Sequence, residues 1–266
     1  MDGHREHREH RDKSAISWER NGLCALCGKM ILMNIPLFHP WKVSPREAIR
    51  IQEKLRKKLR LRAPTTPLRK IAAGDVSYSR LDDMTYAGFL LFTYPDLTLL
   101  ERASAKGHAS FPYIPGLLTF REAPVLLKAF FGLAARPDLI LIDGQGIAHP
   151  RSMGIAAHIG LILNLPSIGC AKSRLIGAHG NLAPSRGSVL PLIEGDRTVG
   201  MVVRTRDGVR PVYVSPGHKM DLDTSVKIVL SLCRGYRIPE PLRQAHSFVN
   251  QLRGMVSHSH GEKNLR

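Results

Sequence analysis

The stretch DLILIDGQG, residues 138–146, decides the fold. The run Leu139–Asp143, which is apolar up to the aspartate of its final Asp-Gly, is typical of a strand that is buried on both faces. A helical pattern follows over 152–164, and a second short strand is expected at 167–171. Strand, helix and strand in alternation indicate an α/β domain.

The rest of the chain extends this pattern on both sides. Ser44 and Pro45 open an amphipathic helix, because a serine N-cap and a proline in the first turn both favour helix initiation. The other expected elements, in chain order, complete the pattern: that helix over 44–61, strands at 71–78, 86–92 and 97–103, a helix over 120–134, strands at 199–204 and 211–215, and helices over 222–233 and 239–252. Three strands followed by alternating helices and strands predict a mixed β-sheet flanked by helices.

The composition sets the broad class of the protein. The chain has 266 residues, of which 43% are hydrophobic, and this is enough for a sizeable core and excludes disorder throughout. No stretch reaches the ~18 uninterrupted apolar residues that a membrane-spanning helix needs, so we expect no membrane partner. The 39 Lys and Arg exceed the 22 Asp and Glu by 17, which predicts affinity for polyanions such as nucleic acid.

The two ends of the chain differ from its centre. Residues 1–40 open with the charge run HREHREHRD and are interpreted as an N-terminal extension, 41–256 as the folded domain and 257–266 as a C-terminal tail. Cys24 and Cys27 have the spacing of a zinc-binding pair, but no second pair follows, which favours a chance pair. The N-terminus has no apolar segment typical of a secretory signal and the four cysteines make no disulfide framework, so we expect a cytoplasmic protein.

Two aspartates and a glutamate are the candidate catalytic groups. Asp75 lies in the otherwise apolar strand IAAGDVSYS, where a buried carboxylate is costly unless it is paired, hydrogen-bonded or bound to a metal. Asp143 follows a buried strand, and in open α/β sheets the loops beyond the carboxyl ends of strands bind ligands. Glu122 lies near the start of a predicted helix. If the three converged, their oxygens would suit Mg²⁺ or Mn²⁺, which can activate water for phosphodiester hydrolysis.

Each of these acids also has a simpler interpretation. An aspartate at the end of a strand is more often a helix cap or a turn residue, and Glu122 fits an ordinary first-turn acid that the helix dipole favours. Sequence spacing does not place the three side chains together in space. The bare pattern therefore leaves a metal site and three unrelated acids both open.

The order of several motifs resembles a known nuclease family. The motifs are AAGDVSYS (72–79), FPYIPGLLTFRE (111–122), DLILIDGQGIAHPRSMGIAAHIGL (138–161), PSIGCAKSRL (166–175), SPGHKMDLDTS (215–225) and GYRIPEPLRQAHSF (235–248). In this order, which covers most of the chain, they resemble endonuclease V, a family of nucleases that act at deaminated purines. The resemblance implies a ribonuclease H-like fold and a Mg²⁺-dependent carboxylate site, and it makes 41–256 the catalytic domain.

The resemblance also implies catalytic roles for individual residues. Asp75, Glu122 and Asp143 would be catalytic acids that hold Mg²⁺, for which Mn²⁺ can substitute, and Glu122 would do so directly or through water. His246 falls where the family has a fourth catalytic residue, Asp or His, and a neutral imidazole there could orient or deprotonate the attacking water. From the sequence alone, His246 is more simply a residue on the polar side of a C-terminal helix.

A proline-bracketed aromatic loop and three separate residues are the candidate substrate contacts. In the family, the loop forms a wedge inserted beside the damaged base; its members here are Pro112, Tyr113, Ile114, Pro115 and Gly116. Two prolines stiffen the loop, so little entropy is lost when the ring stacks on a base, although a rigid turn with a half-buried tyrosine explains the segment equally well. The other implied contacts are Gly144 at the base edge, His149 beside the nucleic-acid backbone, and Lys172 at the phosphate near the scissile bond.

These implications combine into one expected activity. The protein would be a DNA repair endonuclease that recognises deoxyinosine and other deaminated bases in DNA. It would hydrolyse the second phosphodiester bond 3′ to the lesion and leave 3′-hydroxyl and 5′-phosphate ends, acting as a monomer. One alternative is an inosine-specific endoribonuclease, whose substrate differs by the 2′-hydroxyl. A nucleic-acid-binding protein without catalysis is disfavoured, because a mere binder has no use for three acids facing phosphate without a cation.

Overall fold

The computed structural model describes residues 39–79 and 83–261, and the side chains of all of these except 256–261. The described residues belong to one compact unit. The predicted N-terminal extension, including Cys24 and Cys27, lies outside them except for its last two residues. Among the described residues, no helix has both the length and the apolar character that crossing a bilayer requires.

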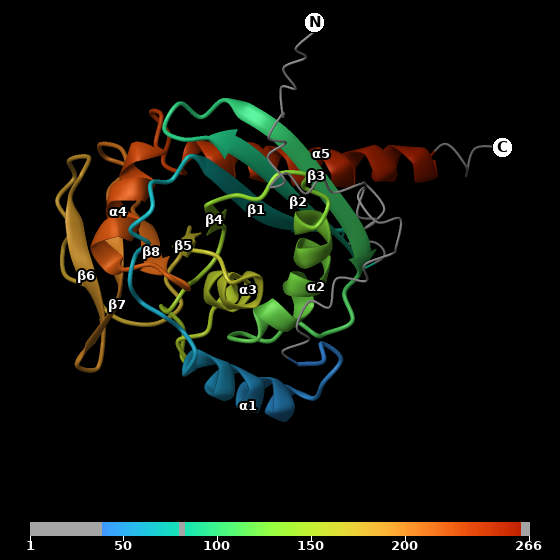
Figure 1. The fold of residues 1–266 in the computed structure, drawn as a ribbon, viewed down its shortest axis with the longest axis horizontal. Coiled ribbons are helices and arrows are strands. Elements are labelled where there is room, and N and C mark those ends of the chain that lie inside the picture. Colours follow the sequence, from blue (N-terminus) through green and yellow to red (C-terminus); the bar gives the residue numbers. More distant parts are fainter. Residues whose placement is uncertain (1–38, 80–82, 262–266) are drawn as a thin grey trace, which may run out of the picture. The chain divides into compact units, whose positions relative to one another are not determined.

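One mixed sheet organises this unit, as the sequence predicts, and it has eight strands (Figure 1). The strands are β1 (Lys70–Tyr78), β2 (Met84–Thr93), β3 (Leu99–His108), β4 (Leu139–Ile142), β5 (Ser167–Ala171), β6 (Val189–Glu194), β7 (Arg197–Val203) and β8 (Val212–Pro216). Their order across the sheet is β3-β2-β1-β4-β5-β8-β7-β6. The central pairs β1–β4 and β4–β5 are parallel, and the other pairs are antiparallel. All four residues of β4 are buried, which explains their apolar character.

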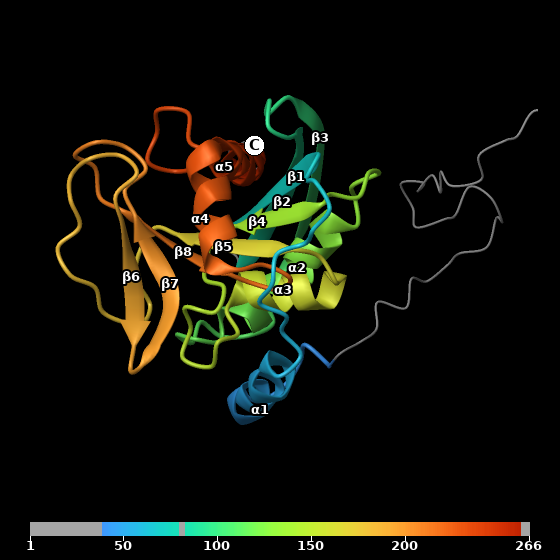
Figure 2. The same ribbon diagram turned by 60° about the vertical axis from the view of Figure 1, so that its left-hand side comes forward.

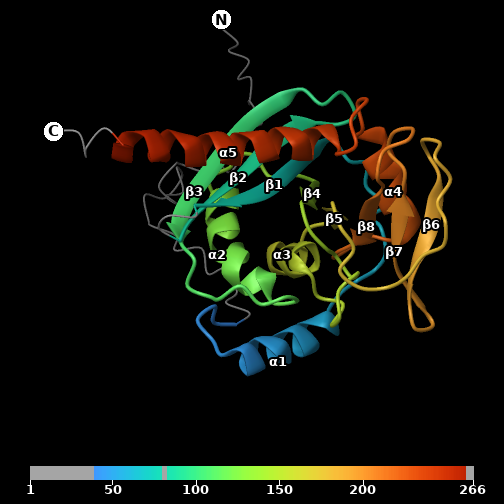
Figure 3. The same ribbon diagram turned by 180° about the vertical axis from the view of Figure 1, so that it is seen from behind.

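Helices cover both faces of the sheet. On one face lie α2 (Leu118–Phe130) and α3 (Ile155–Leu163), and on the other lie α4 (Leu222–Ser231) and α5 (Glu240–Gly261), as Figures 1 and 3 show from opposite sides. Side chains that alternate along β1 explain the two cores. Ala72 packs with residues of α2 and α3, whereas Ile71 and Ala73 pack with residues of α4 and α5. Asp75 therefore has the strand parity that places it on the α5 face.

Helix α1 (Pro45–Arg56) begins where the sequence predicts. The Ser44 hydroxyl accepts a hydrogen bond from the Glu47 amide at 3.2 Å, and Pro45 is the first helical residue. The helix ends at Arg56, before the predicted end at 61, because the amides that follow it bond to carbonyls three residues earlier, as in a 3₁₀ turn. The Lys58 amide donates to the Leu55 carbonyl at 2.9 Å, and the Leu59 amide donates to the Arg56 carbonyl at 3.2 Å. Figure 2 shows α1 below the layer that contains α2 and α3.

Two elements differ from the sequence prediction. Strand β6 is absent from the sequence prediction, and it contains Pro191, a residue that sheets accept mainly in edge strands. Pro191 is tolerated because β6 is the edge strand of the sheet. Helix α5 continues to Gly261, beyond the predicted end at Leu252, because its last turns lack the apolar periodicity on which the prediction depends.

A glycine sets the distance between α5 and the sheet. Gly88 of β2 pairs with Asp75 of β1. A Cβ atom at Gly88 would lie 2.7 Å from Cδ1 of Phe248 and 3.0 Å from Cγ1 of Val249, both on α5. Because real Cβ atoms do not approach other atoms at 2.7 Å, only glycine allows α5 to pack this closely against β2.

Candidate active site: an acidic cluster beside an open pocket

Two aspartates come together at the centre of the sheet. In the parallel pair β1–β4, Gly74 lies opposite Ile142, so the residues that follow them, Asp75 and Asp143, are neighbours. The Asp143 amide donates to the Gly74 carbonyl at 3.3 Å. Asp75 is 7% exposed, and its Oδ1 accepts from the Val76 amide at 2.7 Å. The parallel register thus joins two residues that lie far apart in the chain.

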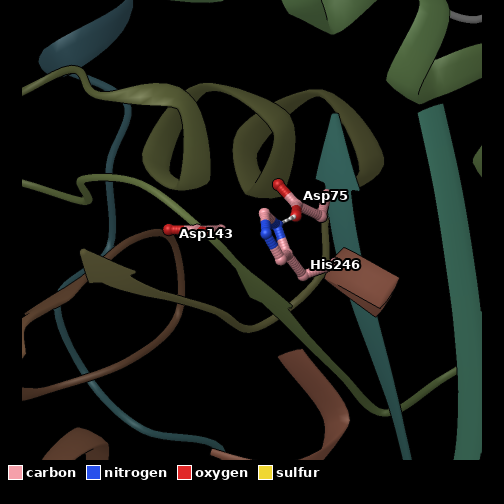
Figure 4. Close-up of side chains that lie close together, drawn as sticks. All are labelled: Asp75, Asp143 and His246. Atoms are coloured by element: carbon pink, nitrogen blue, oxygen red, sulfur yellow. Dashed lines mark hydrogen bonds and ion pairs between the residues drawn. The ribbon is translucent and has the colours of Figure 1, made fainter. Parts of the chain in front are cut away.

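His246 reaches this pair from α5 (Figure 4). Its Nδ1 lies 2.7 Å from Oδ2 of Asp75, and Nδ2 of Asn250 lies 3.1 Å from its Nε2. The Ser77 hydroxyl donates to Oδ1 of Asn250 at 2.9 Å, so the Asn250 amide nitrogen is the group that faces His246. With Asn250 donating to Nε2, the imidazole carries its proton on Nδ1 and donates it to Asp75.

The donor set of these residues fits a divalent cation. Single ligand atoms of Asp75, Asp143 and His246, here called the acidic cluster, all lie within 4.8 Å of one another. The two carboxylates supply the oxygen ligands that Mg²⁺ prefers and that Mn²⁺ also accepts. His246 contributes by orienting Asp75, because both of its ring nitrogens are already hydrogen-bonded. The acidic cluster is the one such group found among the residues that the structure describes.

Glu122 lies near the acidic cluster but is held by another partner. It comes from α2, on the opposite face of the sheet from α5, and its Oε1 accepts a hydrogen bond from the Tyr78 hydroxyl. Burial raises the pKa of Glu122 to about 8; the Tyr78 bond opposes this, and the negative charges of Asp75 and Asp143 add to it. Glu122 therefore interacts electrostatically with both aspartates, although it contributes no atom to the acidic cluster.

Lys172 supplies the positive charge beside Asp143. It follows β5, and its Nζ forms an ion pair with Oδ2 of Asp143. Burial raises the pKa of Asp143 and the nearby Asp75 raises it further, while Lys172 opposes both effects. Arg237 fixes the backbone here, because its Nη2 donates to the Lys172 carbonyl at 2.5 Å and to the Pro211 carbonyl at 2.8 Å.

A pocket of about 340 Å³ opens beside Asp143 and Lys172. Most of the predicted substrate contacts line it, and its walls are residues 113–116, 118–119, 143–145, 149, 154–155 and 171–175. Tyr113, Ile114, Pro115, Gly116, Gly144, His149 and Lys172 are all in this set, whereas Pro112 is not. Tyr113 is 70% exposed, so its ring is free to meet a ligand. The pocket and the acidic cluster share Asp143.

The loop Pro112–Gly116, here called the wedge loop, ends in a tight turn. The Leu117 amide donates to the Ile114 carbonyl at 2.9 Å, and Gly116 has a φ of +78°. Proline followed by a glycine with positive φ is typical of a type II turn. The shape of the loop is thus set by its own sequence.

Both ring nitrogens of His149 are used within the protein. Nε2 donates to the Gly116 carbonyl at 2.8 Å, and Nδ1 accepts from the Arg151 amide at 3.1 Å. Burial lowers the pKa of His149 to about 4, so the ring is neutral, as these bonds require. His149 thus lines the pocket and also holds the wedge loop through the Gly116 carbonyl.

Three polar residues of this region are absent from the site residues predicted from the sequence. Tyr78 binds Glu122, Asn250 binds His246, and Gln52 of α1 binds Gly116. Tyr78 and Asn250 give no signal in a single sequence. Gln52 does, because it occupies a buried position of α1 between Ala48 and Leu55, where an apolar residue is expected.

The fold and site define a nuclease of the ribonuclease H-like class, with acids at the central strands of a mixed sheet. The family model of endonuclease V matches residues 53–247. The chain belongs to the endonuclease V family.

Individual relatives agree with this assignment. An endonuclease V of Dehalococcoides mccartyi (strain CBDB1) is 47% identical over 222 residues, which cover 83% of this chain and 100% of the relative. The crystal structure of endonuclease V from Streptomyces avermitilis is 38% identical, with a TM-score of 0.78, and the match covers 82% of this chain and 96% of that one. A Ciona intestinalis endonuclease V, solved with a 24mer DNA containing an inosine followed by a ribo-adenosine, is 28% identical, with a TM-score of 0.70; the match covers 79% of this chain and 98% of that one.

Proposed function

We propose that this protein is a DNA repair endonuclease that recognises deoxyinosine and related deaminated bases. It hydrolyses the second phosphodiester bond 3′ to the lesion and leaves 3′-hydroxyl and 5′-phosphate ends. The observation that carries the proposal is an open pocket that shares Asp143 with the acidic cluster. The inosine-containing DNA bound by the Ciona intestinalis relative supports the choice of substrate.

The pocket would receive the damaged base. A base must leave the helix to be read in a pocket, at a cost of roughly a few kcal/mol that mispairing reduces. Tyr113, exposed at the pocket and preceded by Pro112, would stack in the space that the base leaves. Gly144, which lines the pocket, would let the main chain approach the edge of the base; a Cβ there would lie 2.6 Å from Cγ2 of Ile155.

The acids would hold the metal. Asp75 and Asp143 would bind Mg²⁺ or Mn²⁺, and Glu122 would bind it directly or through water. When bound, such an ion supplies a Lewis acid that lowers the pKa of water and stabilises charge on the phosphodiester. His246 would orient Asp75 through its Nδ1 proton, and Lys172 would place its ammonium group beside the phosphate.

An inosine-bearing duplex with Mg²⁺ tests the proposal. We expect a nick at the second phosphodiester bond 3′ to inosine, full inhibition by EDTA and recovery with added Mg²⁺. Asp143→Ala should still bind the duplex and not cut it. Full activity of this variant would reject the site, and an intact inosine duplex with wild-type protein would reject the function.

Inosine-containing RNA is the second candidate substrate. The DNA bound by the Ciona intestinalis relative carries a ribo-adenosine after the inosine, so a 2′-hydroxyl is compatible with that protein. Matched strands with deoxyribose or ribose around the inosine separate the two substrates by their kcat/KM values. A monomeric, cytoplasmic enzyme stays a prediction, and sedimentation of the purified protein tests the first part.

A further inference from the structure

Helix α1 packs against the residues on either side of the wedge loop. Phe111 and Leu117, which flank the loop, are each 2% exposed and belong to one apolar cluster with Ala48 of α1. The Tyr113 ring, by contrast, is exposed. The loop therefore has two buried ends on α1 and an exposed aromatic side chain between them.

One polar side chain of α1 joins this contact. Gln52 is fully buried, and its Nε2 donates to the Gly116 carbonyl at 3.2 Å and to the Met153 carbonyl at 3.1 Å. Its Oε1 accepts from Nε of Arg151 at 2.6 Å. Both N–H groups and the oxygen of this buried amide are thus used, and they join segments that are far apart in the chain. A buried amide whose partners are satisfied fixes their relative positions. Its loss would remove one of the donors to the Gly116 carbonyl and the acceptor of the Arg151 Nε–H.

These bonds converge on the Gly116 carbonyl. It accepts from Gln52, from Nε2 of His149 at 2.8 Å and from Nη2 of Arg151 at 2.7 Å. A Cβ at Gly116 would lie 2.9 Å from the same Arg151 nitrogen, so the backbone and the guanidinium are in close contact. Gly116 also lines the pocket, so the position of this carbonyl sets one wall of the pocket.

We propose that Gln52 is a positioning residue for lesion recognition: it holds the wedge loop in the conformation in which Tyr113 and the pocket wall fit the substrate. Gln52 acts through Gly116 and Arg151. A preformed loop loses little entropy on binding, whereas a loosened loop must be ordered by the substrate. Because the role concerns the substrate, this inference rests on the proposed function.

Gln52→Met tests the inference, because methionine has a similar length and makes none of the three bonds. We expect hydrogen exchange over residues 111–118 of the free protein to be about tenfold faster. We also expect the KM for an inosine strand to rise about tenfold while kcat stays within about twofold. Gln52→Glu keeps an acceptor for Arg151 but has no N–H for Gly116, so it should loosen the same loop if Gln52→Met does not fold.

Leu55→Ala is the matched control. Leu55 is a buried residue of α1 that packs with Met153, Ala157 and Leu161 instead of the wedge loop. It should lower the free energy of unfolding without raising exchange over 111–118 or the KM. Unchanged exchange in Gln52→Met would overturn the inference, and so would faster exchange with an unchanged KM. If wild-type protein does not cut inosine strands, the proposed function fails, and exchange alone still decides whether Gln52 holds the loop.

Discussion

His246 lies 2.7 Å from Asp75, between Nδ1 and Oδ2, although the two residues are 171 positions apart in the chain. Asn250, one helical turn further along α5, completes the pair by donating to Nε2 of His246. The geometry selects one tautomer of the imidazole, with its proton directed at the carboxylate. The orientation of the His246 ring is thus fixed by the side chains of Asp75 and Asn250.

Asn250→Leu removes the donor that selects this tautomer. We expect the single-turnover cleavage rate to fall about 10- to 100-fold, as for other partners that orient active-site groups, with an unchanged Kd for the inosine strand. Ser247→Ala, an exposed position on the same helix, should leave both values unchanged. An equal rate in Asn250→Leu and wild-type protein would contradict the assigned tautomer.

Glu122 should make the metal-free protein less stable at high pH. Burial raises its pKa from 4.5 to about 8, so between these values the folded state keeps a proton that the unfolded chain has released. The free energy of unfolding therefore falls as pH rises through this window. Glu122→Gln cannot ionise and should be free of this fall, with a gain on the order of a few kcal/mol at pH 8.

Urea unfolding in EDTA at pH 5 and pH 8 measures this effect. Groups away from Glu122 titrate alike in both proteins, so the difference between the two curves reports Glu122 together with its coupling to Tyr78, Asp75 and Asp143. Parallel pH dependence of wild-type protein and Glu122→Gln would show that Glu122 is charged in the folded state.

Tyr113→Ala should weaken binding of the inosine strand. Stacking of a base on an aromatic ring contributes about 1–3 kcal/mol, so the Kd should rise roughly 5- to 150-fold. Tyr113→Phe keeps the ring and should bind as wild-type protein does. Fluorescence anisotropy with Ca²⁺ in place of Mg²⁺ measures the Kd without cleavage. A Kd that Tyr113→Ala leaves unchanged would remove the ring from recognition.

Lys172→Met should change the salt dependence of binding. If the ammonium group contacts one phosphate, its loss lowers the slope of log K against log salt by about 1, in the same measure for strands with and without inosine. The exposed Lys227 on α4 offers a matched control, and Lys227→Met should keep the slope. A slope that stays the same in Lys172→Met would show that this lysine pairs with Asp143 alone.

The elements that carry a strong periodic signal could be predicted from the sequence. Strand β5 has the predicted bounds, and β4 agrees within one residue, because a strand that is buried on both faces is mostly apolar. Strand β6 is absent from the prediction. It contains Pro191, which is accepted because β6 lies at the edge of the sheet, and a single sequence does not show which strand lies at the edge.

One part of the candidate site was predictable because a residue type is costly in its place. Asp75 stands out because a carboxylate in an apolar strand requires a partner. Asn250 does not stand out, since asparagine on the polar side of a helix is ordinary. Its partner Ser77 lies 173 residues away, and no spacing rule within one segment connects them.

Gly88 has no part in the chemistry, yet it controls how near α5 can come to the strand that bears Asp75. A single added methyl group would act as a spacer, lifting the helix and carrying the imidazole of His246 away from its carboxylate. The absence of a side chain at Gly88 therefore helps to set the distance between His246 and Asp75.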